Sequence, residues 1–200
     1  MRYGVLKDIK EGEFRVISTP AEVRTIVASG HEVWAEHDCG KMAGFPDEKY
    51  AEAGAKIPVF FSGNVSLGIA VLCRLAKEAA KYFPDADIEI VEIHHTRKVD
   101  APSGTALMLF NAIKEVRPEA VANCGRAGEG KRTKDEIGIS ALRMGNVVGV
   151  HEVHIHTGTQ CLTLKHEAVT RAMLADGAVA AARFMEGKAV GFYNMESILG

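Results

Sequence analysis

The stretch from 92 to 105 constrains the fold of this 200-residue chain more than any other. An apolar, β-branched run over 88–93 leads into it and is typical of a strand. Apolar residues at helical spacing over 106–116 follow it and predict a helix. Two histidines, a lysine and a Pro-Ser-Gly-Thr turn stand between these elements. The stretch therefore predicts a strand-to-helix connection that carries titratable side chains.

Each polar residue of this connection has a chemical use. His94 can exchange a proton near neutral pH, and Lys98 can donate a proton or hold a negative charge. Ser103 is expected to cap the helix, which leaves the N–H groups of Gly104 and Thr105 directed at whatever lies before it. Such a helix start favours an anion, for example a carboxylate. We therefore predict a site that binds and protonates a small acidic molecule; the alternative is a surface loop followed by a capped helix.

The residues from 92 to 105 resemble the signature of the 4-hydroxy-tetrahydrodipicolinate (dihydrodipicolinate) reductases of bacterial lysine and diaminopimelate synthesis. The likeness runs from about 57 to the last residue and includes FSGNVSLG at 61–68 and GFYNM at 191–195. It implies an oxidoreductase that uses NADH or NADPH to reduce 4-hydroxy-tetrahydrodipicolinate, a small cyclic dicarboxylate, to tetrahydrodipicolinate.

The resemblance also implies roles for individual residues. His94 and Lys98 would be catalytic and supply protons. His95, Gly104 and Thr105 would bind the substrate carboxylate.

A turn that would line the nicotinamide side of the cleft is implied as well, and it consists of Ser62, Gly63, Asn64 and Val65. It joins an apolar strand, 59–61, to a helix whose apolar face we expect to hold Leu67, Val71, Leu72 and Leu75. By spacing alone, an ordinary strand-to-helix turn is an equally good interpretation.

The first quarter of the chain predicts strand, helix, strand and helix in that order, which suggests an α/β layer. We expect strands at 3–6 and 31–35 and a helix that starts at 19–22, where Thr, Pro and Glu stand at the favoured positions. A second helix is expected from Asp47 to about Gly54.

Residues 1–55 are similar to the N-terminal end of alanine dehydrogenase, with matches such as GVLK at 4–7 and GHEV at 30–33. In that family the arginine that matches Arg15 helps to hold a carboxylate. The family's later catalytic Lys and His motifs have no counterpart in this sequence, so we interpret Arg15 as a structural or relic residue.

A nicotinamide dinucleotide is usually bound by Gly-x-Gly-x-x-Gly between a first strand and its helix. No such pattern precedes residue 57, and the glycines at 125–130 have a different order. A segment similar to alanine dehydrogenase thus stands in place of the reductases' nucleotide-binding half, as in a fusion, a rearranged gene or a chimera. Two alternatives to a reductase stay open: a non-catalytic module that binds a dicarboxylate or serves assembly, and an alanine-dehydrogenase-like oxidoreductase.

The predicted fold class is α/β. It comprises a truncated α/β segment over 1–56 and an α+β domain with a mixed or antiparallel sheet over 57–200, for substrate binding and oligomerisation. The resemblance implies a homotetramer in which these domains pair their sheets.

The last third predicts two alternating strands, 147–157 and 160–165, joined by a turn. His154 and His156 share one face of the first strand, but no third ligand stands at useful spacing, so we predict no metal site. A long helix is expected over 167–186, with an interruption near Gly177.

Composition excludes several partners. The net charge of −2 gives no broad electrostatic reason to bind nucleic acid or an anionic membrane, and no apolar run approaches the roughly 20 residues of a membrane span. The four cysteines lie far apart without a Cys-x-x-Cys pair, which suits reduced thiols in a cytoplasm.

Overall fold

The computed structural model describes residues 2–5, 16, 18–35, 39–46, 48–49, 59–60, 62–189 and 191–200. The chain divides into two compact units, Met1–Phe61 with Phe184–Tyr193, and Ser62–Arg183 with Asn194–Gly200. The domain limits 1–56 and 57–200 stay a prediction. The expectation for Arg15 lies outside the described residues, and of the helix expected from Asp47 to Gly54 the structure describes 48–49, which are helical.

The first unit consists of short elements. They are β1 (Arg2–Val5), α1 (Pro20–Ala28), β2 (Glu32–Ala35), the 3-10 helix η1 (Lys41–Ala43), β3 (Val59–Phe60) and β9 (Phe192–Tyr193). β1 pairs with β2, and β3 with β9, in both cases in parallel. Parallel pairing of β1 and β2 requires a crossover, which contains α1. Val5, Val23, Val33 and Cys39 form the small buried core of these elements.

Helix α1 begins where the sequence predicts. Pro20 is its first residue and Thr19 its N-cap, and the Glu22 carboxylate accepts a hydrogen bond from the Thr19 backbone N–H at 2.7 Å. Gly30 follows the helix with a φ of 80°, the left-handed conformation that glycine adopts most readily.

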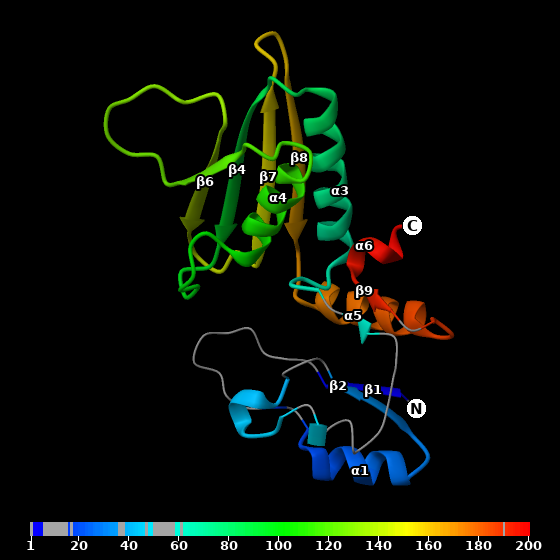
Figure 1. Cartoon of the computed structure of the whole chain (residues 1–200). Helices are drawn as coiled ribbons and strands as arrows, with labels where there is room; N and C mark the ends of the chain where they lie inside the picture. Colours follow the sequence, from blue (N-terminus) through cyan, green and yellow to red (C-terminus); the bar gives the residue numbers. More distant parts are fainter. Residues whose placement is uncertain are drawn as a thin grey trace. The chain divides into compact units, whose positions relative to one another are not determined.

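The second unit is a five-stranded mixed sheet with helices on one face (Figure 1). Its elements are α3 (Leu67–Tyr82), β4 (Asp87–His94), α4 (Gly104–Lys114), β5 (Val121–Cys124), β6 (Glu136–Arg143), β7 (Gly149–His156), β8 (Cys161–Ala168), α5 (Ala172–Met185) and α6 (Met195–Ile198). The strand order is β5-β6-β4-β7-β8, in which β5, β6 and β4 are parallel and β7 and β8 continue antiparallel. The expected α/β class with a mixed sheet is confirmed.

The core of this unit lies between the sheet and helices α3 and α4. Alternate residues of β4 point into it because successive side chains of a strand face opposite sides. Ile88 and Ile90 are fully buried there, and Glu92 and His94 continue the same row toward the end of the strand. This row of β4 thus runs from the apolar core to Glu92 and His94 at the end of the strand, close to the start of α4.

Two helices differ from the sequence expectation. The buried residues of α3 are Ile69, Ala70, Leu72, Ala76 and Ala80, whereas Leu67, Val71 and Leu75 of the expected face are exposed. Small alanines permit close packing of the helix, which a count of large apolar residues cannot reveal.

Helix α5 begins at Ala172 rather than near Glu167, because β8 continues to Ala168. It is continuous through Gly177, where a Cβ atom would lie 1.8 Å from the carbonyl oxygen of Val65. Gly177 therefore serves close packing rather than an interruption of the helix.

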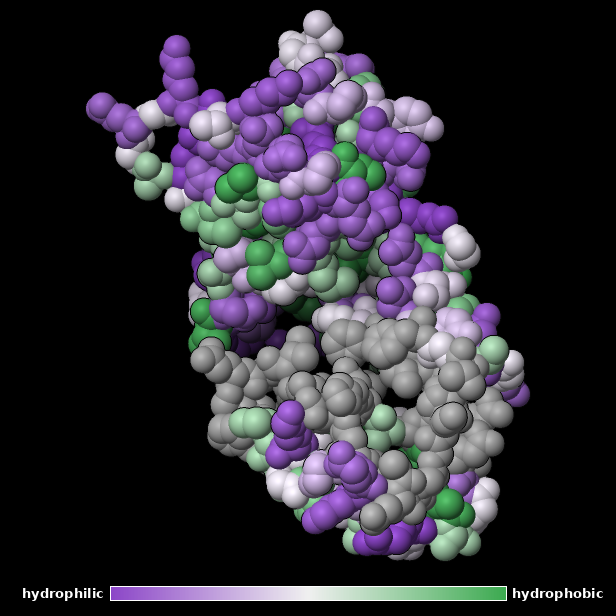
Figure 2. Space-filling view, in the orientation of Figure 1, coloured by the Kyte–Doolittle hydropathy of each residue, from purple (hydrophilic) through white to green (hydrophobic). Residues whose placement is uncertain are grey.

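No helix in the described part of the chain is long and apolar enough to cross a membrane. The loop between β5 and β6 projects from the sheet in Figure 1, and Figure 2 shows a hydrophilic surface there. Two of its basic side chains pair with acidic groups: Arg126 with Glu136, and Lys134 with Asp85 at 3.1 Å.

Candidate ligand site at the start of helix α4

The N-terminus of α4 is built as the sequence predicts. Ser103 is the N-cap, its hydroxyl accepts a hydrogen bond from the Ala106 N–H at 3.2 Å, and the residue is only 2% exposed. Gly104 has no heavy atom within 4 Å of the position a Cβ would take, so this first turn has open space beside it. Backbone N–H groups at such a start are available to an anion.

The carboxylate of Glu92 lies fully buried behind this helix start. Its Oε1 accepts hydrogen bonds from the Ser103 N–H at 3.0 Å and from Arg143 at 2.8 Å. Its Oε2 accepts from Arg143 at 2.8 Å and from His94 Nδ1 at 2.5 Å. Burial alone would raise the pKa of Glu92, but the hydrogen bonds from Arg143, His94 and Ser103 outweigh burial and lower it, so the group is ionised.

His151 stands beside His94 on the neighbouring strand β7. The two rings meet edge to face with centroids 5.1 Å apart, and His151 Nε2 lies 3.2 Å from the Ser103 hydroxyl. His151 is 4% exposed, and burial, followed by the charge of His94, lowers its pKa to about 4. It is therefore neutral at physiological pH, and its Nε2 shares a hydrogen bond with the Ser103 hydroxyl.

A cavity of about 130 Å³ opens in front of these residues. It is lined by Asn64, Ile69, His94, Thr105, Val148, Gly149, His151, His166, Ala168, Arg171, Met173 and Leu174. Within this described lining there is one guanidinium and three imidazoles but no carboxylate. Together with the helix start, this composition favours a small anion over a cation.

Arg171 connects the cavity to His95. Its guanidinium donates a hydrogen bond to His95 Nε2 at 3.0 Å. Burial, and then the charges of Arg97 and Arg171, lower the pKa of His95, so this histidine is a neutral acceptor. His95 does not line the cavity, and it holds the arginine that does.

Lys98 lies in the loop between β4 and α4 and forms an ion pair with Asp100, at 2.8 Å from both carboxylate oxygens. The ammonium group holds the pKa of Asp100 below its usual range. Arg143 donates to the Asp100 carbonyl at 2.6 Å, which ties this loop to the Glu92 network. Of the predicted catalytic pair, His94 lines the cavity and Lys98 does not.

The described polar side chains of the turn at 62–65 form hydrogen bonds to other groups of the chain. Ser62 donates to the Asn64 carbonyl at 2.7 Å, and Asn64 donates from its amide to the Thr105 hydroxyl at 2.9 Å. Gly63 lies against Met108, whose sulfur would be 3.4 Å from an added Cβ. Asn64 is thus the member of this turn that lines the cavity, and the turn supports α4.

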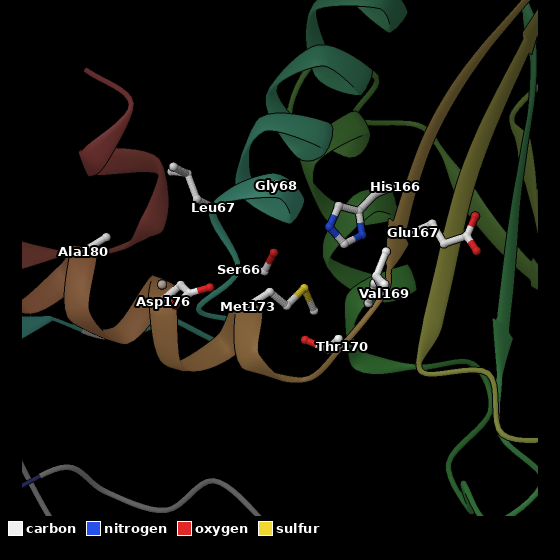
Figure 3. A pocket seen from close by; sticks show the side chains of 12 residues that line it. Ser66, Leu67, Gly68, His166, Glu167, Val169, Thr170, Met173, Asp176 and Ala180 are labelled. Atoms are coloured by element: carbon white, nitrogen blue, oxygen red, sulfur yellow. The ribbon is translucent and has the colours of Figure 1, made fainter.

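A second cavity, of about 430 Å³, lies between the start of α3, the end of β8 and α5. Figure 3 shows the His166 ring and the Met173 side chain within it, while the Glu167 carboxylate points away. His166 also lines the first cavity and packs against Gly68, where a Cβ would lie 2.8 Å from the ring. Burial lowers the pKa of His166.

No group of three or more His, Cys, Asp or Glu side chains within the described residues could hold a metal ion. His154 bonds to Thr163 at 3.1 Å and to Glu152 at 3.2 Å. His156 accepts from the Gly158 N–H at 3.0 Å. Both histidines thus have hydrogen-bond partners within the chain.

The fold and cavity define an α/β protein whose second unit offers a small anion-favouring site at a helix start. Residues 68–199 match the family model described as dihydrodipicolinate reductase, C-terminus. The chain belongs to this family. Residues 4–63 match the model described as alanine dehydrogenase/PNT, N-terminal domain. Both resemblances expected from the sequence are confirmed.

Curated relatives carry the name 4-hydroxy-tetrahydrodipicolinate reductase. The protein of Clostridium tetani is 47% identical over 150 residues, which cover 74% of this chain and 59% of the relative. The protein of Aquifex aeolicus is 44% identical over 155 residues, 76% of this chain and 58% of the relative. The chain thus spans about three fifths of the length of these relatives.

A solved structure described as dipicolinate-bound dihydrodipicolinate reductase from Paenisporosarcina sp. TG-14 is also similar. Its sequence is 25% identical, the match covers 88% of this chain and 70% of that one, and the TM-score is 0.59.

Sequence reasoning missed four residues of the site, namely Glu92, Arg143, His151 and Arg171. Glu92 lies within the signature stretch, but its position in the predicted strand gave no reason to assign it a role in the site. A strand carboxylate two positions before a histidine is a weak local signal for it, because Glu152 and His154 have the same spacing. The other three residues come from distant parts of the sequence and reach the site only through the sheet pairing and helix α5.

Proposed function

We propose that residues 62–183 bind a small dicarboxylate and transfer a proton to it, in the reduction of 4-hydroxy-tetrahydrodipicolinate to tetrahydrodipicolinate. The observation that carries this proposal is the cavity with His94, Thr105 and Arg171 in its lining and no carboxylate among its described residues. Family membership supports the reaction class.

The position of each residue determines the role that we assign to it. The helix start at Gly104 and Thr105 and the Arg171 guanidinium bind carboxylate oxygens, because each offers N–H donors to an anion. His95 orients Arg171. His94 exchanges the proton, and Lys98 supports the negative charge of the substrate after release from Asp100.

In this reaction NADH or NADPH supplies the hydride. The described residues do not fit a whole dinucleotide: the turn of Ser62, Gly63, Asn64 and Val65 directs its described polar side chains into the chain, and no Gly-x-Gly-x-x-Gly pattern precedes residue 57. The steps proposed for this chain are therefore binding and protonation. A dicarboxylate-binding module without catalysis is the second candidate, and the same observation favours it.

One experiment separates the two candidates. Calorimetry of the purified full chain with dipicolinate tests the anion site, and absorbance of NADH or NADPH with fresh 4-hydroxy-tetrahydrodipicolinate tests turnover. Binding with turnover supports the reductase, and binding without turnover supports the module. Absence of dipicolinate binding, with Arg171→Met no different from wild type, would overturn both.

We also propose that this chain acts in the cytoplasm and that its copies form a homotetramer. They would associate through the sheet face that α3 and α4 leave uncovered. That face carries Val91 and the exposed Leu142, together with Glu152 and Lys165. Light scattering on the purified chain tests the subunit number, and a monomer at micromolar concentration would contradict it.

A further inference from the structure

We infer that Glu92 is a positioning residue that keeps the hydrogen of neutral His94 on Nδ1, so that Nε2 is the atom that meets the ligand. This inference rests on the dicarboxylate site proposed above, and it assigns that site a proton-transfer geometry. Glu92 touches neither the cavity nor any ligand position, and it acts through His94.

The first argument is the saturation of the Glu92 carboxylate. An ionised carboxylate only accepts hydrogen bonds and has about four acceptor positions. Arg143 fills two, the Ser103 N–H fills one, and His94 Nδ1 fills the fourth at 2.5 Å. Since the carboxylate cannot donate, Nδ1 must carry the hydrogen.

The second argument is the position of the other ring nitrogen. His94 Nε2 would lie 3.1 Å from a Cβ at Gly149, and both residues line the cavity. The absence of a side chain at 149 therefore leaves Nε2 facing open space. A proton enters or leaves His94 through Nε2, while Nδ1 keeps its hydrogen in both charge states.

The third argument is the double use of Glu92. One carboxylate holds the Nδ1 hydrogen of His94 and the N–H of Ser103, the N-cap of α4. The proton-transfer atom and the anion-binding helix start are thus fixed to the same buried group. Arg143 supplies the compensating charge, since a buried carboxylate without a partner is costly.

The Glu92→Gln variant changes the tautomer expected for His94 while it keeps the size and shape of the side chain. Its side-chain oxygen can occupy the Oε1 position and keep the hydrogen bonds from the Ser103 N–H and from one Arg143 N–H, which leaves the amide nitrogen at the Oε2 position, facing His94 Nδ1 and the second Arg143 N–H. There the amide donates to His94 Nδ1, so the ring hydrogen must move to Nε2. The reverse orientation would set the amide against two donors, Ser103 N–H and Arg143.

The test is ¹⁵N–¹H spectroscopy of the full chain labelled at histidine, with His94 assigned from the spectrum of His94→Gln. At a pH where His94 is neutral, we expect wild type to show Nδ1–H and Glu92→Gln to show Nε2–H. The matched control is Glu152→Gln, whose carboxylate contacts His154; it should leave the His94 signals unchanged. If Glu92→Gln is poorly folded, Glu92→Gln/Arg143→Met removes the unpaired guanidinium, and the same shift of the hydrogen is expected.

Nε2–H in wild type, or Nδ1–H retained in a folded Gln variant, overturns the inference whatever the activity. In a chain with turnover, Glu92→Gln should lower kcat by on the order of 100-fold or more while dipicolinate affinity changes less than about threefold. A loss of dipicolinate affinity as large as the loss of kcat would also count against the inference. A chain without turnover contradicts the reductase function alone, because the tautomer is measured without substrate.

Discussion

Two Glu-x-His pairs occupy adjacent strands of the same sheet, and they have opposite surroundings. Glu92 and His94 of β4 face α4, whereas Glu152 and His154 of β7 face the other side, since Glu152 is paired with Val91. The first carboxylate is fully buried and held by Arg143; the second is partly exposed, with Lys165 at 3.6 Å. The same local spacing therefore gives a buried pair with a saturated carboxylate in one place and a partly exposed pair in the other. Burial and a distant arginine make the difference.

The largest effect is expected from Arg143→Met. The variant leaves the Glu92 charge buried without its guanidinium, and removal of one partner of a buried pair costs about 3 kcal/mol or more of the free energy of unfolding. Lys165→Met on the partly exposed pair is the matched control and should shift the urea midpoint much less, because within one chain its partner Glu152 keeps access to water. Equal urea midpoints for Arg143→Met and Lys165→Met would contradict the claim that the Glu92 pair stabilises the fold more than the Glu152 pair.

Acid should destabilise the buried side of the sheet. The pKa of His151 is lowered from 6.5 to about 4, so the unfolded chain binds the additional proton between these values. Its contribution to stability is complete above about pH 6.5 and is lost as the pH falls to about 4, for a total of about 3 kcal/mol. Unfolding midpoints across this range should fall less steeply in His151→Asn than in wild type. Equal slopes would refute this assignment.

Gly149→Ala probes the space in front of His94. The new Cβ would lie 3.1 Å from Nε2, so the ring must move by a few tenths of an ångström. We expect dipicolinate binding to weaken by about 1 kcal/mol, roughly fivefold, with a small change in stability. Calorimetry measures the affinity, and an unchanged value would mean that Nε2 does not meet the ligand.

The smallest effect is expected from Glu152→Gln. The pair lies away from the cavity, on the sheet face proposed above for association, so dipicolinate affinity should stay the same, and the free energy of unfolding of the single chain should change by less than about 0.5 kcal/mol. Urea unfolding and calorimetry check both. A large loss of binding would show that the two sheet faces are coupled.

The same comparison explains how far the sequence could lead. Local rules predicted β4, α4, the Ser103 cap and the β7–β8 pair, because alternation, helical spacing and caps are contained in short windows. They could not separate Glu92 from Glu152. Arg143 is 51 positions from Glu92, and only the register that pairs His94 with Arg143 brings them together. Helix α3 was predicted with the wrong face because its packing depends on alanines.

The most direct test of the account follows the His94 and His154 ring nitrogens while dipicolinate is added to the full chain. We predict that the Nε2 resonance of His94 shifts with saturation, that its Nδ1 hydrogen stays in place, and that His154 does not respond. Saturable shifts of His154 with none at His94 would contradict the account, as would a ligand contact at His94 Nδ1.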